Sequence, residues 1–246
     1  MPVQHALLII ADISGYTRFM KLHRMSLAHA QDIVARLLEA LIDAAPRLRL
    51  SELEGDAAFF YTPYPEAQEG LIANAVAEHV VAMHLAFHAR QQQMVAGNLC
   101  NCDGCAQTGQ LRVKFVAHVG EVATQKVKRS TKLAGIDVIL VHRMLKNSVP
   151  VPEYLLMSEP VFQHSHERIR QHALGLEQEF EGLGRTQTYF VDLEKISAEM
   201  PPKPRVTWLG RLGETMGVAF RGMPYLLGIK KPCRGFRNVN PDRVIQ

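Results

Sequence analysis

The chain has 246 residues, a formal net charge of +4 and a hydrophobic share of 47%. This size and composition allow a sizeable core in one domain, with or without an appendage. No continuous apolar run approaches the roughly 20 residues of a membrane span. No basic segment precedes the apolar run near the N-terminus, which argues against a signal peptide. With four cysteines and no export signal, we expect a reducing, cytoplasmic location.

Hydrophobic periodicity predicts alternating strands and helices along the first 92 residues. The apolar run Ala6–Ile10 is typical of a buried strand, and Arg47–Leu50 alternates with period two, as a half-buried strand does. The clearest helix repeats Ile72, Val76 and Val80 at spacings of four. The predicted strands are 6–12, 47–50 and 57–62, and the predicted helices are 14–22, 27–45 and 66–92.

The following residues complete an α+β pattern. We expect a long strand over 111–124, a helix over 135–147, a strand over 153–158 and a hairpin over 174–193. Helices interleaved with strands in this order favour a ferredoxin-like sandwich, in which helices pack on a mostly antiparallel sheet.

A basic tail follows the predicted sandwich. The pair Pro201-Pro202 interrupts regular structure, so we place the boundary between a domain over 1–198 and an extension over 199–246. From Met200 onward there are nine Lys or Arg residues and two acidic residues. We expect the tail to pack on the domain; peripheral contact with an anionic membrane is the alternative.

Two aspartates lie in turns that suit phosphate chemistry. Asp12 ends the first predicted strand, and Ser14-Gly15-Tyr16-Thr17 opens the next helix. Free backbone N–H groups at a helix start attract anions, and a neighbouring aspartate can hold a cation that bridges the same phosphates. Asp56 lies in a tight turn between two predicted strands, so adjacent turns would create a two-carboxylate Mg²⁺ site. The alternative is that Asp12 only caps the helix.

Five short motifs, in order, resemble the catalytic domain of class III nucleotidyl cyclases. The resemblance covers residues 5–193 and includes Ala11–Thr17 and Glu54–Ala57. Within that superfamily, Cys100–Cys105 and Val141–Val149 look like a divergent bacterial branch known as a domain of unknown function, DUF2652. The other three cyclase motifs are Val116–Val122, Gly135–Met144 and Phe180–Val191.

The resemblance implies a homodimer with composite sites that use two Mg²⁺ or Mn²⁺ ions. It assigns the purine to Glu52 and Lys132, and stabilisation of the transition state to Arg143. Glutamate at the first purine position goes with guanine in the family, and its carboxylate suits guanine N–H and amino donors; a solvent-facing strand residue is the alternative. The implied metal ligands are Asp12, Asp56 and the carbonyl of Ile13, and the implied triphosphate ligands are Ser14, Gly15, Tyr16 and Thr17.

Three positions depart from the family pattern. Lys132 is neither the usual aspartate nor the usual cysteine, Ile139 replaces an asparagine, and Glu181 replaces a phosphate-binding lysine. Losing one preorganised donor typically costs roughly 10²–10³ in rate. Lys146 and Asn147 on the face of Arg143, and a basic run before that helix, are candidates to compensate. A solvated loop is the alternative for the basic run, which comprises Lys126, Lys128, Arg129 and Lys132.

A thiol cluster is the other distinctive feature. Cys100, Cys102 and Cys105 place three thiols in a short predicted loop, which is a partial Zn²⁺ site that needs a fourth ligand. The alternatives are a redox-active or simply reduced loop. The candidates for the fourth ligand are Cys233, His84 and His88.

Together these features predict metal-dependent binding of a purine nucleoside triphosphate in a signalling protein, with cyclase turnover weak or lost. An active form would be a nucleotidyl cyclase, which is a phosphorus–oxygen lyase. The alternative is a zinc-supported regulatory or interaction module without nucleotide turnover. Neither function implies a specific nucleic-acid partner.

Overall fold

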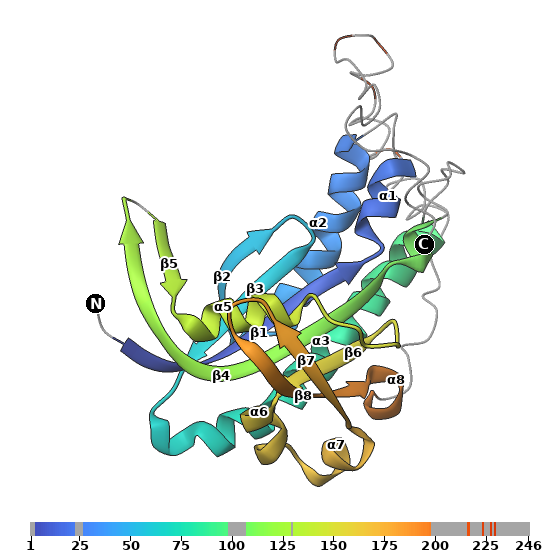
Figure 1. The fold of residues 1–246 in the computed structure, drawn as a ribbon. Coiled ribbons are helices and arrows are strands. Elements are labelled where there is room, and N and C mark those ends of the chain that lie inside the picture. The colour runs from blue at the N-terminus through green and yellow to red at the C-terminus, as the bar shows by residue number, and fades with distance from the viewer. Residues whose placement is uncertain are drawn as a thin grey trace.

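A mixed sheet of eight strands runs through the molecule (Figure 1). The computed structural model describes residues 3–22, 27–97, 107–128 and 130–197, with Met216, Met223, Leu227 and Ile229 beyond them. The strand order is β2-β3-β1-β4-β6-β8-β7, with β5 paired to β4, and the pairs are antiparallel except β4 with β6. The strands are β1 Val3–Ser14, β2 Arg49–Glu54, β3 Ala57–Pro63, β4 Arg112–Val127, β5 Ser130–Ala134, β6 Tyr154–Ser158, β7 Leu174–Phe180 and β8 Gly184–Asp192.

Helices cover both faces of the sheet, which confirms the predicted α+β sandwich (Figure 1). Residues of α2 and α3 share one buried cluster with the sheet, and residues of α5 share the other. The helices are α1 Tyr16–Leu22, α2 Leu27–Asp43, α3 Glu69–Gly97, α5 Ile136–Met144, α6 Glu159–His164, α7 Glu167–His172 and α8 Leu193–Ile196. The 3₁₀ turns are η1 Glu66–Gln68 and η2 Thr108–Gln110.

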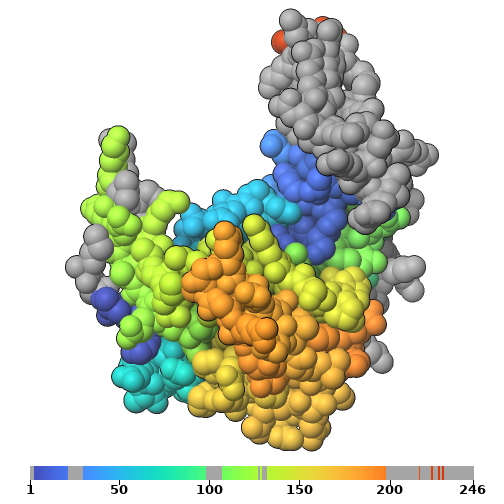
Figure 2. Space-filling model, in the orientation of Figure 1, coloured from blue at the N-terminus to red at the C-terminus, as the bar shows by residue number. Residues whose placement is uncertain are grey.

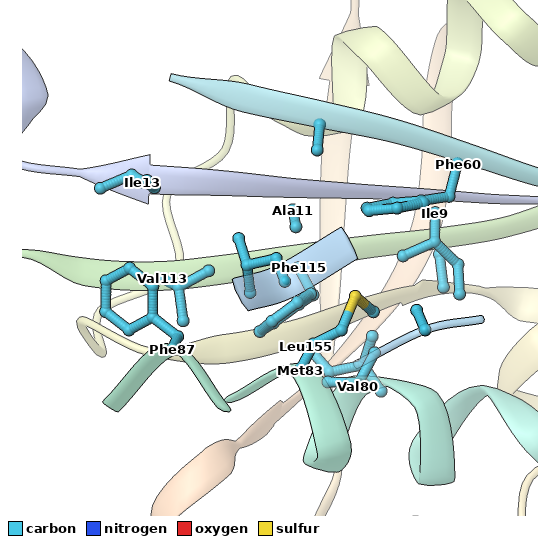
Figure 3. Close-up of a cluster of buried hydrophobic side chains, with 14 of the residues drawn as sticks. Ile9, Ala11, Ile13, Phe60, Val80, Met83, Phe87, Val113, Phe115 and Leu155 are labelled. Carbon is cyan, nitrogen blue, oxygen red and sulfur yellow. The ribbon is translucent and has the colours of Figure 1, made fainter. Parts of the chain in front are cut away.

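Strand β1 pairs with β3 on one edge and with β4 on the other. Its two faces are buried because a helical layer covers each face of the sheet. Successive side chains of a strand point to opposite faces, so Ile9 and Ala11 join the cluster with α3, whereas Leu8 and Ile10 join the cluster with α5. Figure 3 shows the first cluster, with strand side chains packed toward Val80, Met83 and Phe87 of α3. This arrangement explains the continuous apolar run, which a strand exposed on one face would not have.

Helix α3 corrects the expectation about membrane spans. The segment Glu66–Gly97 is long enough to cross a membrane and contains an 18-residue window with a mean hydropathy of 1.4, of which 33% is buried in the fold. Its inner residues, including Val76, Val80 and Met83, are buried against the sheet. By length and composition the segment is therefore a candidate span, and its inner face belongs to the core.

Several predicted boundaries are wrong. The strand predicted at 47–50 is β2 at Arg49–Glu54. Of the basic run, Lys126 lies in β4, Lys128 in the following turn and Lys132 in β5. Helix α5 ends at Met144 because the Asn147 amide donates to the Met144 carbonyl (2.8 Å), so Lys146 and Asn147 do not continue the helix face of Arg143. The short helices α6 and α7, after β6, and α8, after β8, were not predicted, because none of them is long enough for a clear apolar period.

Two further predictions lie outside the described residues. The thiol cluster at Cys100, Cys102 and Cys105 is one of them, and the tail that begins at 199 is the other, apart from four single positions. The domain boundary and the packing of the tail therefore stay predictions.

Helix α5 begins against a close contact between its first turn and β4. His118 Nε2 lies 3.0 Å from Asp137 Oδ1, and the backbone N–H of Glu121 donates to Asp137 Oδ2 at 2.6 Å. A Cβ atom on Gly120 would lie only 2.3–2.4 Å from the Asp137 carboxyl group. Glycine at position 120 therefore lets the carboxylate reach β4 and fixes where α5 starts.

We expect Gly120→Ala to lower the free energy of unfolding by about 1–3 kcal/mol, because the added methyl group displaces the Asp137 carboxylate from its hydrogen bonds. Urea unfolding measures the change. Gly109→Ala is the control, because its Cβ would meet only a Val95 methyl group at 3.7 Å. Equal stability of the Gly120→Ala variant and the wild type would contradict this role of the glycine.

Candidate functional site

Strand pairing places Asp12, near the end of β1, beside the β2–β3 turn that holds Asp56. Asp12 lies opposite Ala57 of β3 and opposite Lys114 of β4. The backbone N–H of Ile13 donates to the carbonyl of Asp56 at 3.0 Å, which ties the end of β1 to the β2–β3 turn. The end of β1 and this turn thus lie side by side, as the two-carboxylate arrangement requires.

Lys114, which the sequence analysis did not single out, forms an ion pair with Asp12. Its Nζ atom lies 2.9 Å from Asp12 Oδ2, and both side chains are mostly shielded from solvent. Burial lowers the pKa of Lys114, but the attraction and hydrogen bond of Asp12 outweigh it, so that the pKa is raised overall. The lysine therefore stays charged beside the aspartate.

Among the described residues, no salt bridge joins Asp56 to a cation of its own. Burial and the nearby Asp12 carboxylate raise the pKa of Asp56 to about 6, against a weaker opposing effect of Lys114. The pKa of the neighbouring Tyr16 is also raised, by burial and by the Asp56 carboxylate. At neutral pH two carboxylates therefore share one lysine, and this excess of negative charge favours a cation between them.

The turn after Asp12 is shaped by Gly15. Its φ of +89° lies in a region that glycine adopts without strain, and its carbonyl accepts the N–H of Phe19 at 2.9 Å, in the first turn of α1. Helix α1 begins at Tyr16, so the capping position belongs to Gly15. The alternative that Asp12 is only a helix cap is therefore wrong.

A polar cavity of about 340 Å³ opens beside this turn. Lys114 lines it together with Arg112, Gly15 and Tyr154, and its lining includes no acidic residue. The Tyr154 hydroxyl donates to Asn147 Oδ1 at 2.9 Å, which fixes that wall of the cavity. Two cationic side chains and a glycine turn make the cavity suitable for an anion.

The remaining implied site residues gather on a different part of the surface. Lys132 Nζ lies 3.1 Å from Glu52 Oε2, so the two implied purine positions form an ion pair at the surface. Arg143 lies 2.8 Å from Glu181 Oε2. Figure 2 shows this surface as a broad depression between the β4–β5 hairpin and α1–α2, with β2 and α5 at its floor.

Neither pair contacts the aspartates within the described part of the chain. Ile139, at the position of the family asparagine, is 50% exposed on α5. The metal half of the implied site and the purine half are therefore separate within one chain.

We expect Asp56→Asn, in the presence of a chelator, to stabilise the protein more at pH 7.5 than at pH 4. The folded chain holds the Asp56 proton with a pKa of about 6, whereas an unfolded aspartate has a pKa near 3.9. Between these values the folded state binds more protons, so the wild-type free energy of unfolding falls as pH rises. The half-exposed side chain limits the gain to about 1 kcal/mol.

Thermal unfolding at both pH values measures this gain, which corresponds to about 2–4 °C in Tm. Asp43→Asn, at an exposed position at the end of α2, is the matched control. A gain in Tm at pH 4 that equals or exceeds the gain at pH 7.5 would show that ionisation of Asp56 does not destabilise the folded protein.

Comparison with known proteins identifies relatives of this chain. The profile of a family described as "Protein of unknown function (DUF2652)" matches residues 34–154. The uncharacterized protein Rv2561/Rv2562 of Mycobacterium tuberculosis is 46% identical over 207 residues, which cover 84% of this chain and 94% of the relative.

Three solved structures share the fold at low sequence identity. The adenylyl cyclase CyaB from P. aeruginosa is 16% identical, with a TM-score of 0.59 over 82% of this chain and 98% of that chain. The guanylate cyclase domain of RhGC from Catenaria anguillulae, in complex with GTP, is 18% identical. Its TM-score is 0.55 over 78% of this chain and 98% of that chain. A class III adenylyl cyclase-like ATP-binding protein from Pseudomonas aeruginosa is 14% identical. Its TM-score is 0.56 over 69% of this chain and 36% of that chain.

The likeness to these structures establishes the fold, and the close relative together with the matching profile establishes the family. The chain belongs to the DUF2652 family and has the fold of class III nucleotidyl cyclase catalytic domains.

Proposed function

We propose that the protein binds a purine nucleoside triphosphate together with Mg²⁺ or Mn²⁺, and that it has little or no cyclase activity. The observation that carries this proposal is the Asp12–Asp56 pair, with Lys114 bound to Asp12 and a cationic cavity adjoining that lysine. Two of the similar structures are a guanylate cyclase domain in complex with GTP and a cyclase-like protein that binds ATP.

The metal would be held by the carboxylates of Asp12 and Asp56 and by the carbonyl of Ile13. Hard divalent cations prefer such oxygen ligands, and the raised pKa of Asp56 reports negative charge that a cation would neutralise. A bound ion of this kind polarises phosphate oxygens. The fit rests on the charge and on the types of donor atoms that the end of β1 and the β2–β3 turn supply.

Lys114 would change partners when metal and nucleotide bind. In the unliganded fold it occupies Asp12 Oδ2, so a metal ion and the lysine compete for the same carboxylate. Once the ion neutralises Asp12, the lysine loses its attraction there and can turn to a phosphate in the adjoining cavity, which it also lines. Arg112, in the same wall, supplies a second cation.

The purine half would come from a second copy of the chain. Glu52 and Lys132 pair with each other and not with the aspartates, so a composite site requires a homodimer, as the cyclase resemblance implies. Guanine offers adjacent N–H and amino donors to one carboxylate and a carbonyl oxygen to a lysine. The Glu52–Lys132 pair therefore favours GTP over ATP.

The residues at the positions that would stabilise the transition state favour nucleotide binding without cyclase turnover. Arg143 is held by Glu181 at 2.8 Å, and the exposed Ile139 cannot donate a hydrogen bond. Losing one such donor costs roughly 10²–10³ in rate. The side chains that would bind a metal triphosphate are present, whereas those that would stabilise its cyclisation are replaced or already paired.

Calorimetric titration with GTP and ATP, in the presence of Mn²⁺, tests this proposal. We expect metal-dependent binding with GTP tighter by about tenfold, and loss of binding in Asp12→Asn. Lys114→Gln separates the two roles of the lysine: nucleotide affinity should fall by about tenfold or more, whereas Mn²⁺ alone should bind more tightly because its competitor is gone.

Lys146→Gln, which removes an exposed lysine beyond α5, should change neither affinity. Equal loss of Mn²⁺ and nucleotide binding in Lys114→Gln would contradict the exchange of partners. Absence of nucleotide binding by the wild type, with either metal, would overturn the proposed function.

A further inference from the structure

A second group of metal-ligating side chains lies buried between α3 and the sheet. His84 and His88 are four residues apart on α3, and Glu153 directly precedes β6. His88 Nε2 lies 2.9 Å and 3.0 Å from the two carboxylate oxygens of Glu153, and His84 Nε2 lies 3.4 Å from Oε2. All three residues are at most 6% exposed. The proposed nucleotide site uses none of them.

The amide of Gln91 fixes the orientation of His88. Its Nε2 atom donates to the carbonyls of Thr108 (2.9 Å) and Leu111 (2.8 Å), which only the NH₂ group can do. Gln91 Oε1 therefore faces His88 Nδ1, at 3.1 Å, as an acceptor. The ring must donate from Nδ1, and in the neutral imidazole this leaves a lone pair on Nε2.

The contact between His88 and Glu153 then joins two acceptors. The carboxylate also accepts the backbone N–H of Val113 at 3.0 Å, as an ionised group does. A lone pair and a carboxylate 2.9 Å apart need a cation between them. A proton added to His88 Nε2 would allow a hydrogen bond to Glu153 at that contact alone. A metal ion would bind both imidazoles and the carboxylate together.

Both histidines have the outer contacts that metal-bound imidazoles have. His88 Nδ1 is held by Gln91, and His84 Nδ1 lies 2.9 Å from the Ser197 hydroxyl. Such contacts orient both rings so that Nε2 faces Glu153, and the Gln91 contact also fixes the tautomer of His88. The ligating atoms of His84, His88 and Glu153 all lie within 4.8 Å of one another, and a carboxylate that binds through both oxygens raises the donor count to four.

We propose that His84, His88 and Glu153 bind one divalent transition-metal ion, with Zn²⁺ as the ion that best suits two imidazoles and a carboxylate. The burial of all three ligands makes this a closed, structural site. It would clamp α3 to the starts of β4 and β6, where Val113 and Glu153 adjoin Lys114 and Tyr154 of the polar cavity. This proposal does not depend on nucleotide binding.

The test is a titration of metal-free, full-length protein with Co²⁺ as a spectroscopic substitute for Zn²⁺. Replacing Cys100, Cys102 and Cys105 by serine removes the candidate thiol ligands, and His142→Gln in the same variant breaks up the described group of Glu52, Glu54 and His142. Excess Mg²⁺ occupies the carboxylates of Asp12 and Asp56. We expect one equivalent of Co²⁺ per chain, with visible bands of nitrogen and oxygen coordination and no thiolate charge-transfer band.

His84→Gln and Glu153→Gln should each weaken Co²⁺ binding by about 100-fold or more. His79→Gln, on the same helix and outside the cluster, should leave it unchanged. If the serine variant binds no Co²⁺, the cation is a proton on His88 and the proposal is overturned. Full Co²⁺ binding in the folded glutamine variants would overturn it equally. If those variants fail to fold, one equivalent of Co²⁺ with nitrogen and oxygen bands in the serine variant that also carries His142→Gln supports the proposal, and no binding by it overturns the proposal.

Discussion

The pairing of β1 with β3 on one edge and β4 on the other is the constraint on which the candidate site depends. Since β1 is also buried on both faces, its register cannot slip by one residue without turning apolar side chains toward the wrong layer. That fixed register sets Asp12 opposite Lys114 and draws the Asp56 turn against Ile13. The core thus positions two carboxylates and a lysine where free loops would not hold them together.

The electrostatic balance of this site suits a ligand that brings both signs of charge. The aspartates carry more negative charge than Lys114 compensates, whereas the adjoining cavity is lined by cations. In the proposed complex, a metal triphosphate would present its cation to the carboxylates and its phosphates to the lysine and Arg112. Outside this centre, Arg143 is paired with Glu181, and Glu52 with Lys132. These side chains therefore support the proposed binding more fully than they support cyclisation.

The sequence was sufficient to predict the fold class. It was also sufficient to place Asp12 at the end of a buried strand and Asp56 in a hairpin turn, because a strand followed by a glycine turn and a hairpin with an acidic turn are local patterns. It did not reveal Lys114, because strand register is set by long-range pairing. Nor did it reveal Glu153 as a partner of His84 and His88, since 65 residues separate it from His88. The four-residue histidine spacing on a predicted helix was the available signal. The end of α5 was misplaced because a single side chain, that of Asn147, decides it.

A crystal structure with Mn²⁺ and a non-hydrolysable GTP analogue tests the central claim most directly, because anomalous scattering locates manganese independently of the protein atoms. The account predicts manganese between Asp12 and Asp56, with Lys114 Nζ moved from Asp12 to a phosphate oxygen. Manganese at another place, or Lys114 still paired with Asp12 while nucleotide is bound, would contradict it.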